Sequence, residues 1–355
     1  MKILRNIALV LLIILTILII IVCSLYNYNI KAVDKNDSTL IEVVIPAGSS
    51  VKKIGEILEE KELIRNADFF YIYSKLYNIN DMKATTYSLS KDMDLAEIIE
   101  VLREGNNYNP NEISITFKEG INIRNVATTI SQNTTNKYED IIALVNDEKY
   151  LDELISKYWF LTEDIKNKEI YYGLEGYLFP DTYIFSNQNV DTKDIFKKML
   201  DQTEKVLAEY KTEVEKSNYS VHQIMTMASV VEKEGKTKDF KNIASVFYNR
   251  LNLNMKLQSC ATTYYGMGLD FNEVGIANSE MVNNRNPYNT YQISTLPIGP
   301  IGLPSKAAIE AAVRPANTKY LYFLSDNEGV TYFFNTYAEH QQKEKELIQQ
   351  GKWQR

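Results

Sequence analysis

The sequence predicts an α+β protein in which an N-terminal transmembrane helix is followed by a small α+β module and a larger mixed α+β domain. Three observations support this fold class: an uncharged apolar run near the N-terminus, short alternating strand patterns each followed by a helical pattern, and a length of 355 residues. That length allows about two domains of roughly 150 residues each. With 45% hydrophobic and 24% charged residues, the composition is that of a folded protein and not of a disordered one.

Charge and rare residue types argue against several classes of function. Lys and Arg total 39 against 46 Asp and Glu, and this net charge of −7 argues against a nucleic-acid-binding protein, which usually carries a basic face. Two His and two Cys argue against a Cys/His zinc site, an iron–sulfur cluster and a disulfide framework. We therefore expect no metal and no cofactor, and proton chemistry carried by carboxylates. His222 and His340 are expected to be structural or solvated.

The N-terminal residues predict a membrane anchor. The run from Ile7 to Leu25 contains no charged side chain. About 20 apolar residues, at about 1.5 Å each, span a hydrocarbon core of roughly 30 Å. We expect a transmembrane helix over residues 7–27, preceded by a short N-terminal segment at residues 1–6.

The residues on either side of this run predict its orientation. Lys2 and Arg5 precede it, so the positive-inside rule places the N-terminal segment in the cytoplasm and the rest of the chain outside. A cleaved signal peptide is the alternative, but its apolar region would be shorter and small residues would follow, whereas Tyr26 follows here. Residues 28–40 are polar and are expected to form a linker.

A weak internal repeat organises the next part of the chain. Residues 45–58 align with residues 117–130, and each segment contains a strand end, a turn at Gly48 or Gly120, and a helix with apolar residues three, six and ten positions after the Gly. The expected module spans residues 41–112 and also contains a helix, a strand and a helix, at 68–77, 87–90 and 94–103. The alternative is two unrelated strand–turn–helix units that share only common turn chemistry.

The larger domain is expected at residues 113–355, with its boundary between residues 105 and 115. The segment from Leu174 to Tyr183 places Glu175 and Tyr177 beside Gly and Pro residues. Aromatic faces with nearby carboxylates commonly hold sugar rings, but ordinary turns pack in the same way. This segment is therefore a candidate binding site with a structural alternative.

The helix expected over residues 221–234 carries the candidate acids. At about 100° per residue, one buried stripe is formed by Ile224, Met227, Ala228 and Val231. Glu232 and Glu234 lie about 90° and 70° from the middle of that stripe, and Gly235 ends the helix. Lost solvation and the negative end of the helix dipole both raise the pKa of such a carboxyl group, as a general acid requires. The alternative is a solvated Glu-Lys-Glu surface patch.

Downstream segments supply candidate walls for a cleft. Three Pro and two Gly between residues 296 and 304 exclude regular structure and predict a long rigid loop flanked by polar donors. The remaining expected elements are three helices and a hairpin, at 240–253, 305–313 and 337–352, and at 320–324 with 330–334.

Several motifs in one order resemble the membrane-bound endolytic murein transglycosylases, the MltG or YceG-like family. They cover nearly everything after the anchor: LEGYLFPDTY at 174–183, MASVVEKE at 227–234, ASVFYNRL at 244–251, LQS at 257–259, PYNTY at 287–291, LP-x-GP at 296–300 and PANTKYLYF at 315–323. Two departures stand out. Cys260-Ala261 replaces the Asp-Pro that relatives usually carry, and Ile298 replaces a Pro.

The resemblance implies roles for the module, the larger domain and single residues. It implies that residues 41–112 form a LysM-like module and that residues 113–355 form the catalytic domain. The catalytic Glu of the family falls on Glu234, with Glu232 as the fallback. The expected substrate-binding residues are Glu175, Tyr177, Glu232, Gln258, Asn289, Thr290 and Tyr291.

The resemblance also implies an activity and a location. The expected reaction cleaves the β-1,4 bond between N-acetylmuramic acid and N-acetylglucosamine within nascent glycan strands. It leaves 1,6-anhydro ends and limits strand elongation, without a metal or cofactor. The expected location is the bacterial cell membrane, with the peptidoglycan glycan strand as substrate and with penicillin-binding protein synthases and division or elongation proteins as candidate partners. A muramidase-type hydrolase and a non-catalytic peptidoglycan-binding scaffold are the alternatives.

Overall fold

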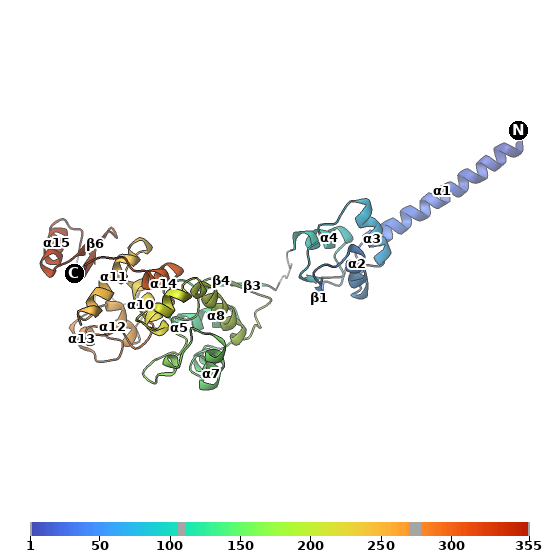
Figure 1. Ribbon diagram of the computed structural model, residues 1–355. Coiled ribbons are helices and arrows are strands. Elements are labelled where there is room, and N and C mark those ends of the chain that lie inside the picture. The colour runs from blue at the N-terminus through green and yellow to red at the C-terminus, as the bar shows by residue number, and fades with distance from the viewer. Residues whose placement is uncertain (1, 106–110, 270–277, 354–355) are drawn as a thin grey trace. The chain divides into compact units, whose positions relative to one another are not determined.

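The computed structural model describes residues 2–105, 111–269 and 278–353. Contacts within the chain divide it into two units, Met1–Asn111 and Glu112–Arg355. Figure 1 shows that a long N-terminal helix belongs to the first unit, and that helices dominate both units. The described strands form three two-stranded antiparallel sheets. The mixed α+β class with one N-terminal apolar helix is the class that the sequence predicts.

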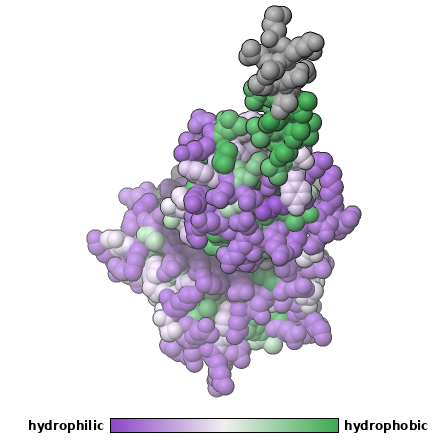
Figure 2. Space-filling view, turned by 90° about the vertical axis from the view of Figure 1, so that its right-hand side faces the viewer, coloured by the Kyte–Doolittle hydropathy of each residue, from purple (hydrophilic) through white to green (hydrophobic). Residues whose placement is uncertain are grey.

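The first unit begins with helix α1 (Lys2–Ile30), which has a hydrophobic surface where its side chains are described (Figure 2). Its residues Leu11–Ile30 are long and apolar enough, by length and composition, to cross a membrane. The helix continues past both ends of the span expected at residues 7–27. The linker expected at residues 28–40 begins inside this helix, and the backbone N–H of Asp34 then donates to the Lys91 carbonyl.

The remainder of the first unit is a compact module. It contains β1 (Ile41–Val44), α2 (Val51–Glu60), α3 (Ala67–Leu76), β2 (Thr86–Leu89) and α4 (Leu95–Glu104). The two strands pair antiparallel, with Val43 opposite Tyr87. Both side chains are fully buried in a core that also receives Leu58 from α2, Phe70 from α3 and Leu102 from α4.

The second unit is mostly helical. In chain order its elements are β3 (Ile113–Thr116), α5 (Ile123–Asn133), α6 (Tyr138–Leu144), α7 (Glu148–Lys157), η1 (Glu163–Lys166), β4 (Thr182–Phe185), α8 (Thr192–Ala208), α9 (Lys211–Lys216), α10 (Val221–Glu234), η2 (Thr237–Asp239), α11 (Phe240–Asn252), α12 (Cys260–Gly266), α13 (Ser279–Asn283), α14 (Lys306–Val313), β5 (Tyr322–Ser325), β6 (Thr331–Phe334) and α15 (Tyr337–Gln349). Strand β3 pairs with β4, and β5 pairs with β6 as the expected hairpin.

The strand–turn–helix pattern of the sequence repeat is present in both units. Strands β1 and β3 are each followed by a left-handed glycine, Gly48 at φ 79° and Gly120 at φ 73°, and then by helices α2 and α5. Glycine adopts this conformation without the strain that a Cβ atom would add. The sequence repeat therefore corresponds to the same local strand–turn–helix structure in two separate units.

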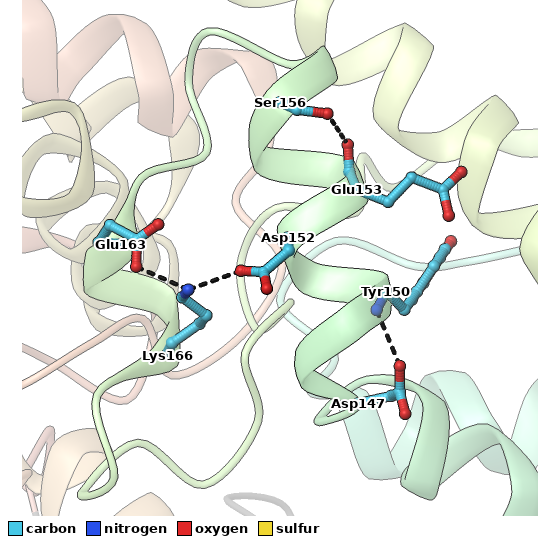
Figure 3. Close-up of polar contacts among 7 residues, drawn as sticks. All are labelled: Asp147, Tyr150, Asp152, Glu153, Ser156, Glu163 and Lys166. Carbon is cyan, nitrogen blue, oxygen red and sulfur yellow. Dashed lines mark hydrogen bonds and ion pairs between the residues drawn. The ribbon is translucent and has the colours of Figure 1, made fainter.

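Ion pairs fasten short elements to the outside of the second unit. Lys166 of η1 lies between Asp152 of α7 and Glu163, with Nζ–O distances of 2.6 and 2.7 Å (Figure 3). The start of α7 is capped by Asp147, which accepts a hydrogen bond from the Tyr150 N–H at 2.8 Å (Figure 3). These contacts hold the acidic segment between α6 and β4 in place.

Helix α10 is the centre of the second unit. It packs against α14, α11 and α12, and its buried residues include polar side chains as well as the predicted apolar stripe. Thr226 and Ser229 are tolerated inside because each hydroxyl donates to a carbonyl of the same helix. The sequence predicts one buried stripe, but the helix is buried all round from Ile224 to Val231, while Gln223 in its first turn is exposed and its last turn, Glu232–Glu234, is partly exposed.

Candidate active site

Glu234 is the last residue of α10, and the neighbouring helix fixes the backbone around it. Gly235 follows in an extended conformation and ends the helix. A Cβ atom at Gly235 would lie 2.3 Å from Cδ1 of Ile243, a fully buried residue of α11. A larger residue does not fit there unless that packed side chain moves. The close approach of α11 therefore sets the point from which the Glu234 side chain leaves the helix.

The environment of Glu234 suits a general acid. Burial raises the pKa of Glu234 above its usual value. A hydrogen bond that the Ser259 hydroxyl donates to Glu234 Oε1, the positive charge of Arg250 and the backbone of Ala261 oppose this effect without cancelling it. A raised pKa keeps the carboxyl group protonated closer to neutral pH, so that it can donate a proton to a leaving group.

A cavity of about 310 Å³ lies beside Glu234. It is lined by Glu234, Phe247, Arg250, Leu257, Gln258, Ser259, Tyr291, Tyr322, Phe323, Tyr337 and His340. A larger cavity of about 660 Å³ has the first turn of α10 in its wall, and its described lining contains one carboxylate, the exposed Asp164. The smaller cavity is the candidate active site because a carboxylate with a raised pKa lies in its wall.

Arg250 ties together the two sides of this cavity. The side chain is buried, and its Nε donates to the Leu321 carbonyl at 2.6 Å while Nη1 donates to the Leu257 carbonyl at 2.8 Å. The guanidinium lies 5.1 Å from the centre of the Tyr322 ring. Arg250 therefore connects the loop before α12 to strand β5 and places a positive charge near Glu234, where it favours the carboxylate that remains after proton transfer.

Gln258 and Tyr291 are the predicted binding residues that line the same cavity as Glu234. Gln258 is in a left-handed conformation at φ 57°, which costs a residue with a Cβ atom about 1–2 kcal/mol. Its backbone N–H donates to the Thr290 carbonyl at 3.2 Å, and its Oε1 accepts from Arg250 at 3.4 Å. Strained backbone of this kind is typical of sites where position matters more than stability.

His340 lines the cavity although the sequence gives no reason to expect it there. It comes from α15, whose polar sequence resembles a solvated helix, and it packs against Tyr322 and Tyr337. Its buried Nδ1 has no hydrogen-bond partner in the part of the chain that the structure describes. Burial lowers the pKa of His340, so the imidazole is neutral near neutral pH. His340 is therefore packed and not solvated, and its structural role stays a prediction.

Glu175 and Tyr177 do not line the cavity, contrary to the prediction. Glu175 is fully buried and accepts hydrogen bonds from the backbone N–H of Ile123 at 3.1 Å and from the Tyr265 hydroxyl at 2.9 Å. It therefore caps the first turn of α5, and burial raises the pKa of Glu175 to about 7. The Tyr177 hydroxyl is buried against Nδ1 of His222 at 2.8 Å. Both residues hold the interior together.

Asn289 and Thr290 are also buried, behind the wall of the cavity rather than on it. The Asn289 amide donates to three carbonyls around α13, of Met281, Val282 and Asn284. Thr290 Oγ1 accepts from the Ser259 N–H at 3.0 Å. These two residues position the loop that carries Ser259 and Tyr291, so their predicted contact with substrate is corrected to a supporting role.

Glu232 points away from the cavity that Glu234 lines. Its Oε2 accepts from the N–H of Ser305 at 2.9 Å and from the Ser305 hydroxyl at 2.5 Å, at the start of α14. Burial raises the pKa of Glu232 as well. The two acids of the Glu-Lys-Glu motif therefore have different surroundings, one at a helix cap and one at a cavity.

The loop at residues 296–304 is largely buried, with Leu303 paired to the turn after β3, and its first residues, Leu296, Pro297 and Ile298, line the larger cavity. The loop therefore lines a cavity, as a cleft wall would, but not the cavity beside Glu234. Among the described residues, no group of three or more His, Cys, Asp and Glu side chains is arranged to hold a metal ion.

Known proteins resemble this chain over most of its length. A sequence model of the YceG-like family matches residues 43–346. An endolytic murein transglycosylase of Bacillus subtilis is 36% identical over 321 residues, which are 90% of this chain and 88% of that protein. One from Streptococcus pneumoniae is 34% identical over 332 residues, which are 89% of this chain and 60% of that protein.

A solved structure has a similar fold. The crystal structure of a YceG-like protein from Listeria monocytogenes matches with a TM-score of 0.61 and 36% sequence identity, over 86% of this chain and 99% of that chain. The match to the family extends from β1 into α15 and so includes the cavity around Glu234. The chain belongs to the YceG-like family.

Proposed function

We propose that this protein is an endolytic murein transglycosylase whose general acid is Glu234. The observation that carries the proposal is a partly buried carboxylate with a raised pKa in the wall of a cavity whose other walls are mainly aromatic and polar. Relatives of 34–36% identity bear the name of this activity. The substrate is the glycan strand of peptidoglycan, cut within the strand between N-acetylmuramic acid and N-acetylglucosamine.

One carboxyl group is sufficient for the proposed reaction. Glu234 donates its proton to the glycosidic oxygen as the bond from that oxygen to C1 of the muramic acid breaks. The acetamido group of the same sugar stabilises the developing positive charge. The Glu234 carboxylate then takes the proton of the C6 hydroxyl while O6 bonds to C1 and closes the 1,6-anhydro ring. No water is activated, so the second carboxylate that most glycosidases require is not needed.

The surroundings of Glu234 support both steps. Ser259 donates to Oε1 and holds the carboxyl group in one orientation. Arg250 stabilises the carboxylate after the first step, because its charge acts on Glu234. The candidate second acid, Glu232, accepts two hydrogen bonds from Ser305 and is not part of the cavity lining, which disfavours a hydrolase with paired carboxylates.

The first unit has a proposed role in location. Its β1–α2–α3–β2 order with antiparallel strands is consistent with a LysM-like module that binds glycan, and α1 is consistent with a single membrane span. Lys2 and Arg5 support a cytoplasmic N-terminus and an external catalytic unit. In that arrangement the enzyme releases growing strands near the membrane, where penicillin-binding protein synthases and division or elongation proteins are its proposed partners.

Product analysis tests the activity. The full-length protein in detergent is incubated with purified glycan strands, and the products are identified by mass spectrometry. We expect internal cleavage with 1,6-anhydro ends. Reducing ends would support a muramidase-type hydrolase, and intact strands would support a non-catalytic scaffold. A Glu234→Gln variant should leave the strands intact, whereas a matched Glu232→Gln variant should still cleave them.

A further inference from the structure

Helix α3 of the first unit exposes an apolar face. Ile72 and Leu76 are 63% and 71% exposed, and the next residue after the helix, Tyr77, is 53% exposed. The buried side of the helix is formed by Ala67, Phe70 and Ser74. An exposed apolar face on a helix of only 10 residues is unfavourable in water and is typical of a surface that contacts another apolar phase.

This face continues the hydrophobic surface of α1. The ring of Tyr26 in α1 lies 5.9 Å from the ring of Phe69 and 6.3 Å from that of Tyr73, both in α3. The hydroxyls of Tyr26 and Tyr77 are 3.0 Å apart. Figure 2 shows hydrophobic surface on the module directly beside the hydrophobic α1. The apolar surface therefore passes from the proposed membrane span onto the module.

Arg65 fixes the angle between α1 and the module. Its Nη1 donates to the carbonyls of Tyr28 and Lys31 at 2.9 and 2.5 Å, and its Nη2 donates to those of Ala32 and Val33 at 2.6 and 3.1 Å. The guanidinium also lies 4.6 Å from the centre of the Tyr28 ring. Tyr28 lies in the last turn of α1 and the other three carbonyls directly follow the helix, where backbone groups lack helical partners, so Arg65 joins the end of α1 to the module.

The position of Tyr26 along α1 sets the level of α3 relative to a bilayer. The apolar stretch Leu11–Ile30 ends four residues after Tyr26, which is about 6 Å along the helix. Tyrosine side chains concentrate at this depth, where the hydrocarbon meets the headgroups. The polar edge of α3, with Asp68 and Lys75, lies beside its apolar face, as in helices that rest on a membrane surface.

We infer that α3 lies on the external surface of the cell membrane, with Ile72 and Leu76 inserted among the lipids beside α1. This inference rests on the proposed membrane span. Lipid, and not a protein, covers the apolar face of α3, because that face is continuous with the helix that enters the bilayer. The module is then fixed on the membrane in one orientation, rather than carried at a distance on a flexible linker.

Tryptophan fluorescence in vesicles tests this inference. The full-length protein carrying Leu76→Trp is reconstituted in vesicles of phosphatidylcholine with brominated acyl chains, and the emission of wild-type protein, which has two Trp residues, is subtracted. We expect the brominated lipid to quench at least half of the added emission, and aqueous acrylamide to quench little of it. A Val44→Trp variant should behave in the opposite way, since Val44 is 53% exposed on β1, which lies farther from α1 than α3 does (Figure 1).

A second control separates the inference from the proposal on which it rests. Ile19→Trp reports on the middle of α1 and should be quenched strongly by brominated lipid. If Ile19→Trp is quenched while Leu76→Trp behaves like Val44→Trp, α1 is an anchor but α3 does not lie on the membrane. If Leu76→Trp is shielded from acrylamide but not quenched by the lipid, a protein surface covers α3 and the inference is wrong. If Ile19→Trp itself is not quenched, the proposed membrane span fails together with the inference.

Discussion

Two acids of the second unit, Glu175 and Glu234, share a raised pKa but differ in what they face. Glu175 is enclosed, and its oxygens are taken up by the first N–H of α5 and by the hydroxyl of Tyr265. Glu234 accepts a hydrogen bond from the Ser259 hydroxyl but also lines a cavity of about 310 Å³. A perturbed pKa alone therefore does not identify a catalytic acid. A perturbed carboxylate must also have space for a substrate beside it.

The largest expected effect is on cleavage and belongs to Glu234. Glu234→Gln removes the transferable proton while preserving the shape of the side chain, so we expect cleavage to fall on the order of 10²–10⁴-fold. The melting temperature should stay close to that of the wild type, because the amide still accepts from Ser259. Release of anhydro-ended fragments measures the rate. A variant that cleaves as fast as the wild type would remove Glu234 from the mechanism.

Glu175→Gln should have the reverse effect, on stability and not on cleavage. The pKa of Glu175 is raised from 4.5 to about 7 on folding, so the folded protein binds this proton more tightly than the unfolded chain does. Stability therefore falls as the pH rises from 4.5 through about 7, by about 3 kcal/mol at most. Gln cannot ionise, so the variant should be the more stable protein at pH 8 and lose most of that advantage at pH 5.

Denaturant titrations of both proteins at the two pH values measure this difference. Cleavage by the folded variant should remain within about threefold of the wild-type rate, because Glu175 is not part of the cavity lining. An identical pH dependence of stability in the two proteins would show that Glu175 is not held in its neutral form. A loss of cleavage as large as that of Glu234→Gln would erase the distinction between the two acids.

Ser259→Ala removes the hydrogen bond that Glu234, but not Glu175, accepts from Ser259. The Ser259 hydrogen bond lowers the pKa of Glu234, so its removal should raise that pKa further. The alkaline limb of the pH–rate profile should therefore move to higher pH, and the maximal rate should fall by about tenfold or less, since an oriented hydrogen bond contributes about 1 kcal/mol. A limb that moves to lower pH would contradict the assignment of Glu234 as the protonated acid.

The smallest expected effect concerns the backbone at Gln258. Replacement by Gly removes the left-handed strain, whereas replacement by Ala keeps it, so Gln258→Gly should be about 1 kcal/mol more stable than Gln258→Ala. Both variants lose the side chain that lines the cavity and should bind glycan less tightly. Thermal unfolding and a substrate titration check the two effects. Equal stability of the two variants would mean that the strained conformation relaxes once the Gln side chain is absent.

Sequence reasoning predicted local features well and distant ones poorly. The apolar N-terminal helix, the end of α10 at Gly235 and the position of Glu234 on it depend on residues close together in the chain, so periodicity and helix-stop signals found them. Arg250 and His340 line the same cavity as Glu234, but they come from separate helices, and no local pattern indicates that they converge there.

The same reasoning could not distinguish which side of a wall a residue faces. In the segment around Asn289 and Thr290, these two side chains are buried behind the loop, while Tyr291 lines the cavity. Glu175 satisfied the pattern for a sugar-binding carboxylate, but it caps α5, a helix more than forty residues earlier in the chain. Orientation of this kind is fixed only when the tertiary contacts form.

The absence of a side chain at Gly235 makes the protein sensitive to substitution at a position that does not line the cavity. A Gly235→Ala change adds one methyl group, no charge and no polar atom, at a residue outside the cavity lining. The added Cβ atom would lie 2.3 Å from Cδ1 of Ile243, so either that buried side chain or the last turn of α10, together with Glu234, has to shift. In a random mutant library, clones with reduced cleavage should therefore also arise at this position, and a screen that inspects only residues touching the substrate would overlook them.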